Sequence, residues 1–272
     1  SHLRPGVRLV AMVKAASYGA GDFEVAQLLQ HQGVDYLAVA FADEGVLLRE
    51  RGITMPVVVL NADADSFDAM AANRLEPEIY SLRSLHEFAA AVERYGEQRY
   101  PIHVKLDTGM HRLGFVEEEL PALLDALARC GRTVRVASVF AHLCTSDDPA
   151  QDDFTRLQIA RFDRMSSRIA EALPYPVLRH TANSAAIERF PEAQYDMCRL
   201  GLGLYGFGFE HNAALRPVST LRTRIVAIKH LAAGETVGYG RAGRLTRPSV
   251  TATIPVGYAD GLDRHLGCGR WS

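Results

Sequence analysis

Several side chains that could do chemistry stand directly after short apolar runs, where buried strands would end. Lys14 closes the apolar run of residues 7–13 and is followed by small residues, Tyr18 and the glycines at 19 and 21. Burying an unpaired ammonium is costly, so such a lysine needs a lowered pKa, a covalent partner or a path to water. A lysine that forms a Schiff base is one solution. A lysine whose tip reaches solvent is the simpler one, and this stretch alone favours it.

Two further stretches place a cationic or titratable side chain in the same kind of position. Arg112 ends the stretch Lys105-Leu-Asp-Thr-Gly-Met-His-Arg112 after the apolar run 102–106, and His142 follows the run 134–140. Taken alone, such an arginine is most often a surface or ion-paired residue, and such a histidine is as often structural as functional. Lys105 would repel Arg112 in a buried site, so a buried pair needs an anion.

Two later stretches could bind an anion. Ser184 ends His180-Thr-Ala-Asn-Ser184 and opens a short expected helix, where its hydroxyl could cap the helix or hold a phosphate. Arg199 is followed by Gly201 and Leu202 in a glycine-rich loop, and glycines let backbone amides approach an anion closely. A glycine-rich loop alone is weak evidence, and both interpretations of Ser184 stay open.

The order of apolar and amphipathic segments predicts how these side chains are positioned. Apolar runs predict strands at residues 7–13, 36–40, 56–60, 77–80, 102–106, 134–140, 177–180 and 197–200. Helical periodicity predicts helices at residues 23–32, 43–51, 66–72, 82–95, 117–130, 153–173 and 184–190. This alternation favours an α/β fold, a closed (β/α)8 TIM-type barrel over residues 1–206. Such a barrel gathers functional residues at the carboxyl ends of its strands, where Lys14, His142, His180 and Arg199 all fall.

Residues 207–272 have a different texture. Residues 218–230 alternate as an antiparallel strand does, residues 250–256 predict another strand, and turn-rich stretches follow each. We therefore expect the start of a mainly β C-terminal domain, truncated before it has enough strands to close on itself. The first strand begins within a few residues of Ser1 and the sequence stops at Ser272, so we expect a piece of a longer polypeptide.

Composition excludes several classes of function. With 48% hydrophobic and 23% charged residues and a net charge of −2, the sequence is that of an ordinary globular protein without an electrostatic footprint for nucleic acid. No apolar run is long enough for a membrane span, and no signal-peptide pattern opens the chain. The four scattered cysteines, Cys130, Cys144, Cys198 and Cys268, predict no zinc or other metal site and are expected to be reduced thiols in a cytosolic protein.

Taken together, these stretches resemble the motifs of the alanine racemases, in family order and over nearly the whole chain. The first reads V-K-A-A-S-Y-G-A-G against the family's V-K-A-N-A-Y-G-H-G, so Lys14, Tyr18 and both glycines match. The stretches K-x-D-T-G-M-x-R, H-x-x-N-S, R-x-G-x-x-x-Y-G, V-G-Y-G and G-Y-A-D-G follow. The departures are Ala16-Ser17 in place of Asn-Ala and Ala20 in place of His.

Alanine racemases use pyridoxal 5'-phosphate (PLP), and the resemblance implies which residues bind it. Lys14 would hold the cofactor covalently, and Arg199 would contact its pyridine nitrogen. The other implied cofactor contacts are Tyr18, Arg112 on the phenolic oxygen, His142 within the hydrogen-bond network, and Ser184 with the amides of Gly201 and Leu202 on the phosphate. Lys105 is a candidate for carbamylation, which would let it hold Arg112. An arginine cannot pass a full proton to the ring nitrogen, which should limit side reactions such as transamination.

The reaction implied by the resemblance is the interconversion of L-alanine and D-alanine, for peptidoglycan precursor synthesis in the cytoplasm. Two bases would flank the α-carbon: Lys14, and Tyr239 from the partner subunit of a homodimer. Tyr258 would line the substrate entrance, also across the dimer. A tyrosine is a poor base unless its neighbours lower its pKa, and we assign that task to His142 and Arg199.

Other functions stay open at this point. A racemase for serine or for a broad set of amino acids would share every motif, and a PLP-binding protein without turnover is the non-enzymatic alternative, against which Tyr239 argues. A related decarboxylase would need an acidic partner for the ring nitrogen, and Arg199 argues against it. The stretches S-Y-G-A-G and A-D-E-G-V also resemble the racemase half of bacterial fusions in which a Mur ligase precedes the racemase.

Overall fold

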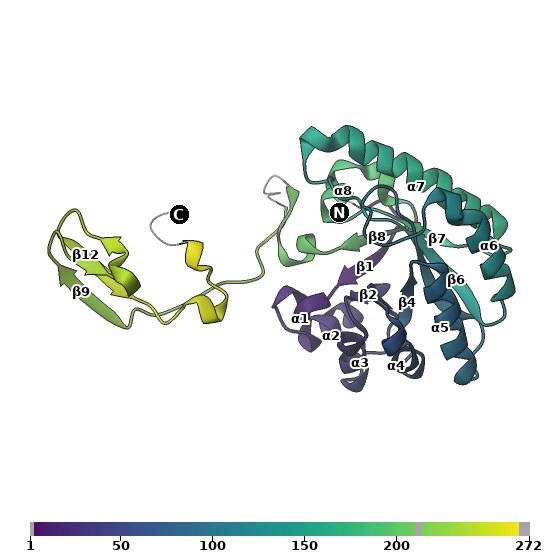
Figure 1. Cartoon of the computed structure of the whole chain (residues 1–272), viewed down its shortest axis with the longest axis horizontal. Coiled ribbons are helices and arrows are strands. Elements are labelled where there is room, and N and C mark those ends of the chain that lie inside the picture. Colours follow the sequence, from purple (N-terminus) through teal and green to yellow (C-terminus); the bar gives the residue numbers. More distant parts are fainter. Residues whose placement is uncertain (1–2, 210–213, 267–272) are drawn as a thin grey trace. The chain divides into compact units, whose positions relative to one another are not determined.

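A computed structural model describes residues 3–209 and 214–266 of the 272-residue chain. The chain separates into two compact units, residues 1–218 and residues 219–272 (Figure 1). The first unit extends to Val218 because residues that follow the barrel pack back on it: a Cβ at Gly206 would lie 2.3 Å from the carbonyl oxygen of Arg216. The predicted division between residues 206 and 207 stays a prediction.

The first unit is built on eight parallel strands, as predicted. The strands are β1 Arg8–Met12, β2 Tyr36–Val39, β3 Val57–Val59, β4 Glu76–Ile79, β5 Tyr100–Lys105, β6 Val134–Phe140, β7 Leu178–His180 and β8 Met197–Leu200. Their order is β7-β6-β5-β4-β3-β2-β1-β8, with every neighbouring pair parallel. Between β7 and β8 the barrel is joined by single hydrogen bonds from Asp196 N–H to the Arg179 carbonyl (3.1 Å) and from Arg199 N–H to the Ala182 carbonyl (3.0 Å). The barrel is therefore nearly closed.

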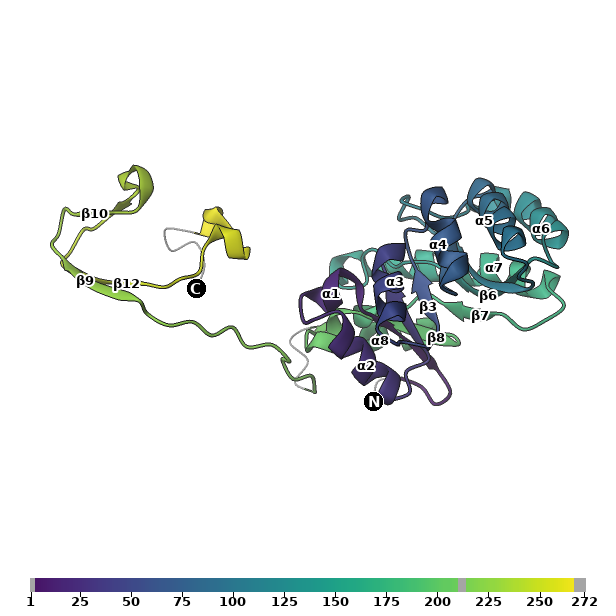
Figure 2. The same ribbon diagram turned by 90° about the horizontal axis from the view of Figure 1, so that it is seen from below.

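Helices connect successive strands and lie around the outside of the barrel (Figures 1 and 2). They are α1 Lys14–Tyr18, α2 Phe23–His31, α3 Ala42–Glu50, α4 Phe67–Ala72, α5 Leu82–Arg94, α6 Leu120–Arg129, α7 Asp152–Ala172 and α8 Ser184–Arg189. Seven of them, α2 to α8, match the helices predicted from sequence periodicity, within a few residues at each end. The eighth, α1, is not a regular helix and was not predicted.

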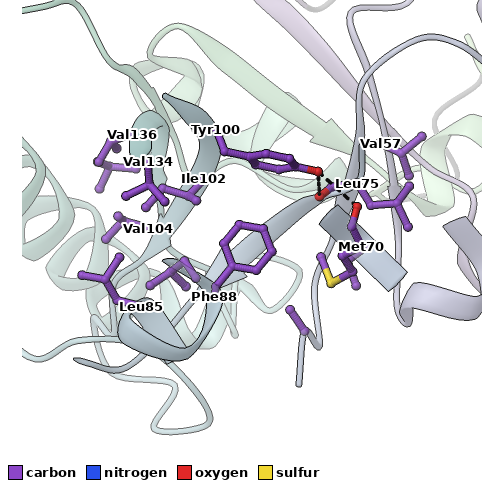
Figure 3. Close-up of a cluster of buried hydrophobic side chains, with 14 of the residues drawn as sticks. Val57, Met70, Leu75, Leu85, Phe88, Tyr100, Ile102, Val104, Val134 and Val136 are labelled. Atoms are coloured by element: carbon purple, nitrogen blue, oxygen red, sulfur yellow. Dashed lines mark hydrogen bonds between the residues drawn. The ribbon is translucent and has the colours of Figure 1, made fainter. Parts of the chain in front are cut away.

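Most of the hydrophobic core lies between the strands and these helices. Alternate residues of the strands face outward, and on β5 these are Ile102 and Val104, both fully buried beside Phe88 of α5 (Figure 3). The Tyr100 hydroxyl donates to the carbonyl oxygens of Met70 (3.1 Å) and Leu75 (3.0 Å), so its burial leaves no donor unpaired. The sequence pattern therefore predicts what is seen: strands rich in β-branched residues, with one face packed against the buried side of a helix.

The inside of the barrel divides into an apolar half and a polar half. A small cluster of Val10, Met12, Ala38, Val58 and Met197 fills the side formed by β1, β2, β3 and β8. Across the barrel, the buried inward positions of β4 to β7 are polar or charged, including Glu76, Glu78, His103, Lys105, Ser138 and His180. Such barrels are usually filled with branched apolar side chains, so a polar half indicates that these residues serve a site.

The second unit is a small antiparallel structure. Strands β9 Ala227–Leu231 and β12 Ser249–Thr253 pair with each other, and two-residue strands β10 Thr236–Val237 and β11 Gly243–Arg244 form a second ribbon. The antiparallel prediction is confirmed. The predicted strand at residues 218–230 was too long, because strand structure begins only at Ala227. The inner hydrophobic residues of these strands remain largely exposed, since two paired strands cannot bury a face by themselves.

Two further features bear on the sequence-based expectations. Among residues 3–209 and 214–266, no helix is both long and apolar enough to cross a membrane. Cys130, Cys144 and Cys198 are free thiols in the described parts of the chain, whereas Cys268 lies outside them.

Candidate active site

A cavity of about 410 Å³ opens at the carboxyl ends of the barrel strands. All nine barrel residues singled out from the sequence line it: Lys14, Tyr18, Lys105, Arg112, His142, Ser184, Arg199, Gly201 and Leu202. Other lining residues include Glu78, Asn61, Phe140, Asp147 and Asn183. The carboxyl ends of parallel strands meet at one edge, which is why residues so far apart in sequence share a single cavity.

Lys14 is held by an unusual turn of backbone. The residues that follow it, Ala15, Ala16, Ser17 and Tyr18, all have positive φ near +50°, so α1 is a single left-handed turn. Each non-glycine residue in this conformation costs about 1–2 kcal/mol. Sequence reasoning placed the lysine correctly at the strand end but did not predict this turn. Strain of this kind persists at functional sites when the surrounding structure holds it in place.

Glu44 of α3 is the residue that holds the turn. One of its carboxylate oxygens accepts a hydrogen bond from Ala15 N–H (2.6 Å), and the other accepts from Ala40 N–H (2.6 Å) and Phe41 N–H (3.0 Å). One carboxylate thus joins the segment after β1 to the end of β2. Sequence reasoning missed this residue. The sequence feature that could have indicated Glu44 is an acidic residue in the first turn of a helix that follows a strand. This pattern is common and is easily explained by helix capping.

Tyr18 and the glycine loop meet on one side of the cavity. A Cβ added at Gly201 would lie 3.0 Å from the Tyr18 hydroxyl oxygen, so glycine allows this close approach. The Tyr18 ring packs on Tyr205 with the ring centres 5.0 Å apart, and Tyr205 is itself fixed by donating to the Met12 carbonyl (2.8 Å). Burial raises the pKa of the Tyr18 hydroxyl, which therefore remains a neutral donor.

Ser184 faces the same loop, and its predicted role as a helix cap is wrong. The capping residue of α8 is Asn183, whose side-chain oxygen accepts from Ala186 N–H (3.0 Å). Ser184 is the first residue of the helix, and its hydroxyl oxygen accepts hydrogen bonds from the N–H groups of Gly201 (3.0 Å) and Gly203 (3.1 Å). Because the Ser184 hydroxyl does not cap the helix, it lies with these amides beside Tyr18. This arrangement of donors suits an anion.

Arg199 is buried beneath the cavity and surrounded by acceptors. Its guanidinium donates to His180 Nδ1 (2.9 Å) and to the carbonyl oxygens of Ala141 (2.7 Å) and Thr181 (3.0 Å), and a longer contact reaches His142 Nδ1 (3.3 Å). Burial lowers its pKa to about 10, so the side chain is still protonated at neutral pH. A cation held by neutral acceptors keeps its positive charge available to a partner in the cavity.

His142 is neutral in this environment. Burial, together with the positive charges of Arg199, Lys105, Arg112 and Lys14, lowers its pKa to about 2. The histidine can therefore accept or donate a hydrogen bond in the cavity but carries no charge at neutral pH.

Lys105, Arg112 and Glu78 form a charged group on the opposite wall. Lys105 is 6% exposed and Glu78 is 2% exposed, and the side chains of these two residues and of Arg112 make no hydrogen bond or ion pair within residues 3–209 and 214–266. Burial lowers the pKa of Lys105 to about 8, and burial raises that of Glu78 against the attraction of Lys105 and Arg112. A buried Lys105–Arg112 pair needs an anion. Glu78, which sequence reasoning did not identify, places a carboxyl group in the same cavity wall.

The two tyrosines predicted from the β motifs lie in the second unit. Tyr239 is 95% exposed there and Tyr258 is 71% exposed. The side chain of Tyr239 is therefore almost fully exposed to solvent within its own unit.

The donors in the cavity fit a phosphorylated aromatic aldehyde. An anionic group suits the Tyr18 hydroxyl, which lies beside Gly201, and Ser184 with the amides of Gly201 and Gly203 that donate to it. The guanidinium of Arg112 suits a phenolic oxygen, and Arg199 suits a ring nitrogen that accepts but need not be protonated. Lys14 supplies the amine that such an aldehyde needs.

Comparison with known proteins agrees with this geometry. The family model for the alanine racemase N-terminal domain matches residues 1–208, and that for the C-terminal domain matches residues 218–271. The alanine racemase of Symbiobacterium thermophilum is 38% identical over 267 residues, which are 95% of this chain and 69% of that protein.

Solved structures also match this chain. The structure of the alanine racemase of Clostridium difficile 630 superposes on it with a TM-score of 0.86 at 32% identity, covering 97% of this chain and 70% of the racemase chain. The alanine racemase of Bartonella henselae, solved with covalently bound pyridoxal phosphate, superposes with a TM-score of 0.82 at 26% identity, covering 97% of this chain and 72% of that one. A cavity with an amine, an anion cradle and two arginines, on a chain matched by both domain models, leads to one conclusion: this chain belongs to the alanine racemase family of PLP-dependent isomerases.

Proposed function

We propose that this chain interconverts L-alanine and D-alanine with PLP held in the barrel cavity. The observation that carries the proposal is the convergence of Lys14, Arg112, Ser184 and Arg199 on one cavity at the carboxyl ends of the strands. The chemistry that PLP supplies when bound is withdrawal of electrons from the α-carbon of an amino acid, which makes the α-proton removable.

The protein's own residues hold the cofactor in this proposal. Lys14 binds it covalently; Tyr18, Ser184 and the amides of Gly201 and Leu202 hold its phosphate. Arg112 donates to its phenolic oxygen. Arg199 donates a hydrogen bond to its ring nitrogen and keeps its own proton, because its pKa of about 10 leaves it charged at neutral pH. The ring nitrogen thus stays unprotonated, which favours proton exchange at the α-carbon over side reactions.

Two bases move the proton. With PLP bound, the amine of Lys14 would remove or return the α-proton of the substrate on one face. Tyr239 from a second copy of the chain acts on the other face, and inversion follows because the two groups stand on opposite sides. Since His142 is neutral, the positive charge that makes the phenol a usable base comes from Arg199, and His142 contributes only hydrogen bonding.

The sharing of the site requires a homodimer, with Tyr258 at the substrate entrance. The 95% exposure of Tyr239 in its own unit supports this arrangement, because the phenol is accessible to a second copy of the chain. We further propose that the reaction takes place in the cytoplasm and supplies D-alanine for peptidoglycan precursors. Three free thiols among the described residues accord with a reducing compartment.

Lys105 is proposed as a site of carbamylation. Its pKa of about 8 leaves part of the population as the neutral amine that reacts with carbon dioxide. Glu78 competes for the same task, because an unmodified Lys105 paired with the Glu78 carboxylate would also relieve the repulsion between Lys105 and Arg112.

Absorbance and turnover test the proposal. The chain purified with PLP should show the visible band of a lysine-bound cofactor, and Lys14→Ala should lose it. Racemisation of D-alanine and D-serine should be compared side by side, and alanine should be preferred. In Tyr239→Phe, kcat/KM should fall more steeply for L-alanine than for D-alanine; equal rates in the L-to-D direction for Tyr239→Phe and the unmodified chain would refute the role of the phenol.

A further inference from the structure

A continuous line of hydrogen bonds crosses the polar half of the barrel and ends on Arg199. Arg199 Nη1 lies 2.9 Å from His180 Nδ1, and His180 Nε2 lies 2.9 Å from Ser138 Oγ. Ser138 Oγ lies 2.6 Å from His103 Nδ1, and His103 Nε2 lies 2.7 Å from Glu76 Oε2. Only Arg199 of these five residues lines the cavity.

The five residues come from five successive strands. Glu76 is on β4, His103 on β5, Ser138 on β6, His180 on β7 and Arg199 on β8. Parallel pairing sets Ser138 opposite His103, so their inward side chains meet inside the barrel. All five are buried; Ser138 is fully buried, and Glu76, the most exposed, is only 9% exposed. The line therefore runs from the start of β4 to the floor of the cavity through buried side chains, and only its Glu76 end is slightly exposed.

The chemistry of the two ends fixes every proton along the line. A guanidinium can only donate, so His180 Nδ1 must be the unprotonated nitrogen and Nε2 must carry the proton. His180 Nε2–H donates to Ser138, whose single hydroxyl proton then goes to His103 Nδ1. His103 carries its proton on Nε2 and donates it to the Glu76 carboxylate, which can only accept.

No other assignment of protons pairs every donor with an acceptor. If His103 carried its proton on Nδ1, that group and His180 Nε2–H would both face the Ser138 oxygen, and the buried hydroxyl proton would have no acceptor. A buried unpaired donor costs about 1–3 kcal/mol. Burial also lowers the pKa of His180 well below its usual value, which agrees with a neutral ring. The ring is held flat against Phe140, with ring centres 4.9 Å apart and planes 7° from parallel.

We propose that Glu76, His103 and Ser138 are positioning residues that hold the His180 ring through its Nε2–H, so that Nδ1 faces Arg199 and fixes the orientation of Arg199 in the cavity. Glu76 is the anchor, because its carboxylate keeps the His103 proton on Nε2 and so leaves His103 Nδ1 to accept the hydroxyl proton of Ser138. The part of this inference that concerns catalysis rests on the proposed function, in which Arg199 contacts the cofactor's ring nitrogen. The direction of the hydrogen bonds does not depend on that function and can be measured separately.

The direct test is the protonation pattern of the histidine rings in the PLP-loaded chain. Nitrogen-15 NMR of histidine-labelled protein distinguishes protonated from unprotonated ring nitrogens, with resonances assigned through His103→Gln and His180→Gln. Both His103 and His180 should be neutral with the proton on Nε2. A proton on Nδ1 of either ring in the unmodified chain would overturn the proposal, and this result needs no variant of Glu76 to fold.

Variants at Glu76 test the anchor. In Glu76→Leu, His103 should change to the Nδ1–H form, because its Nε2–H loses the carboxylate acceptor. His180 should keep its proton on Nε2, because Arg199 can only donate to Nδ1, but its Nε2 resonance should shift as His103 Nδ1–H competes for the Ser138 oxygen. Glu76→Gln is the matched control: its amide oxygen can still accept from His103, so both rings should keep the pattern of the unmodified chain. Unchanged His103 and His180 resonances in Glu76→Leu, or a Glu76→Gln that behaves like Glu76→Leu, would overturn the proposal.

Ser138→Ala tests whether the effect travels along the line. With the hydroxyl removed, Glu76→Leu should change His103 alone, and the His180 Nε2 resonance should be the same as in Ser138→Ala. A change at His180 in the double variant would show that the effect passes by another route. For racemisation, Glu76→Leu should lower kcat by about tenfold with little change in KM, and Glu76→Gln should restore it. If alanine is not racemised at all, the proposed function fails while the NMR result still decides the hydrogen-bond line.

Discussion

Replacing His142 should make the chain markedly less sensitive to acid. His142 is neutral in the folded chain because burial and the neighbouring positive charges lower its pKa to about 2, from 6.5 in an unstructured chain. Between these two values the unfolded chain binds a proton that the folded chain does not, so acid favours unfolding. The stability that His142 contributes is fully present above about pH 6.5 and is lost as the pH falls below that value.

The size of the effect follows from the two pKa values. Each pH unit in the window is worth about 1.36 kcal/mol, so lowering the pH from about 8 to about 4.5 should remove about 2.7 kcal/mol of unfolding free energy through His142 alone. His142→Asn keeps a polar side chain in the cavity but cannot bind a proton. Its loss of stability over this range should therefore be about 2.7 kcal/mol smaller than that of the unmodified chain.

Urea unfolding of the cofactor-free chain at several pH values measures the difference. The helices lie in the barrel unit, so the circular dichroism signal of helices reports on the relevant unit. His86→Gln is the matched control for the loss of a histidine, because His86 is exposed on α5 and lies outside the cavity. If His142→Asn and His86→Gln lose stability equally between about pH 8 and pH 4.5, His142 is not held neutral by its surroundings and the reasoning fails.

Three further outcomes follow from the geometry. Glu44→Ala should cost about 2–3 kcal/mol of unfolding free energy, because three backbone N–H groups lose a carboxylate acceptor. It should also weaken PLP binding in fluorescence titrations, because the left-handed turn after Lys14 loses the hydrogen bond that holds it. Unchanged PLP affinity would count against this role of Glu44. Gly114→Ala should lower the free energy of unfolding in urea by about 2–4 kcal/mol, because φ of Gly114 is +123° and the new Cβ would lie 2.7 Å from backbone atoms of Leu106 and Asp107. The control is Gly131→Ala, where the nearest atoms would lie 3.4 Å from the new Cβ and the free energy of unfolding should change by less than about 1 kcal/mol. Carbamylation of Lys105 should give a carbon-13 carbonyl signal when the protein is labelled with carbon-13 bicarbonate. This signal should rise between about pH 7 and pH 9, because the neutral amine fraction of a group with a pKa of about 8 increases about tenfold over that range. If the signal is absent at both pH values, Glu78 is the anion beside Lys105 and Arg112.

The sequence by itself determined the order of elements and the residues at the strand ends. A period of two residues in the apolar runs and of about 3.6 in the intervening segments is a local property, so it is readable without knowing the fold. Parallel strands then place their carboxyl ends together by rule, which is why Lys14, His142 and Arg199 could be expected in one site before any distance was known.

Only the tertiary structure decided how those residues are held. The left-handed turn after Lys14 contradicts the local preference of Ala15 and Ala16, and it depends on a carboxylate from a helix that is remote in sequence. Likewise, the change of capping residue from Ser184 to Asn183 depends on the amides of Gly201 and Gly203, which claim the serine hydroxyl.

The polar line from Glu76 to Arg199 shows the same limit most clearly. Only His180 and Arg199 belong to motifs, whereas Glu76, His103 and Ser138, read alone, are ordinary strand residues. Their connection arises from the register of neighbouring strands and from the exclusion of water inside the barrel, which forces each buried donor to find an acceptor. Sequence periodicity records which face of a strand is buried, but the partner that a polar side chain meets there is set by the strand beside it.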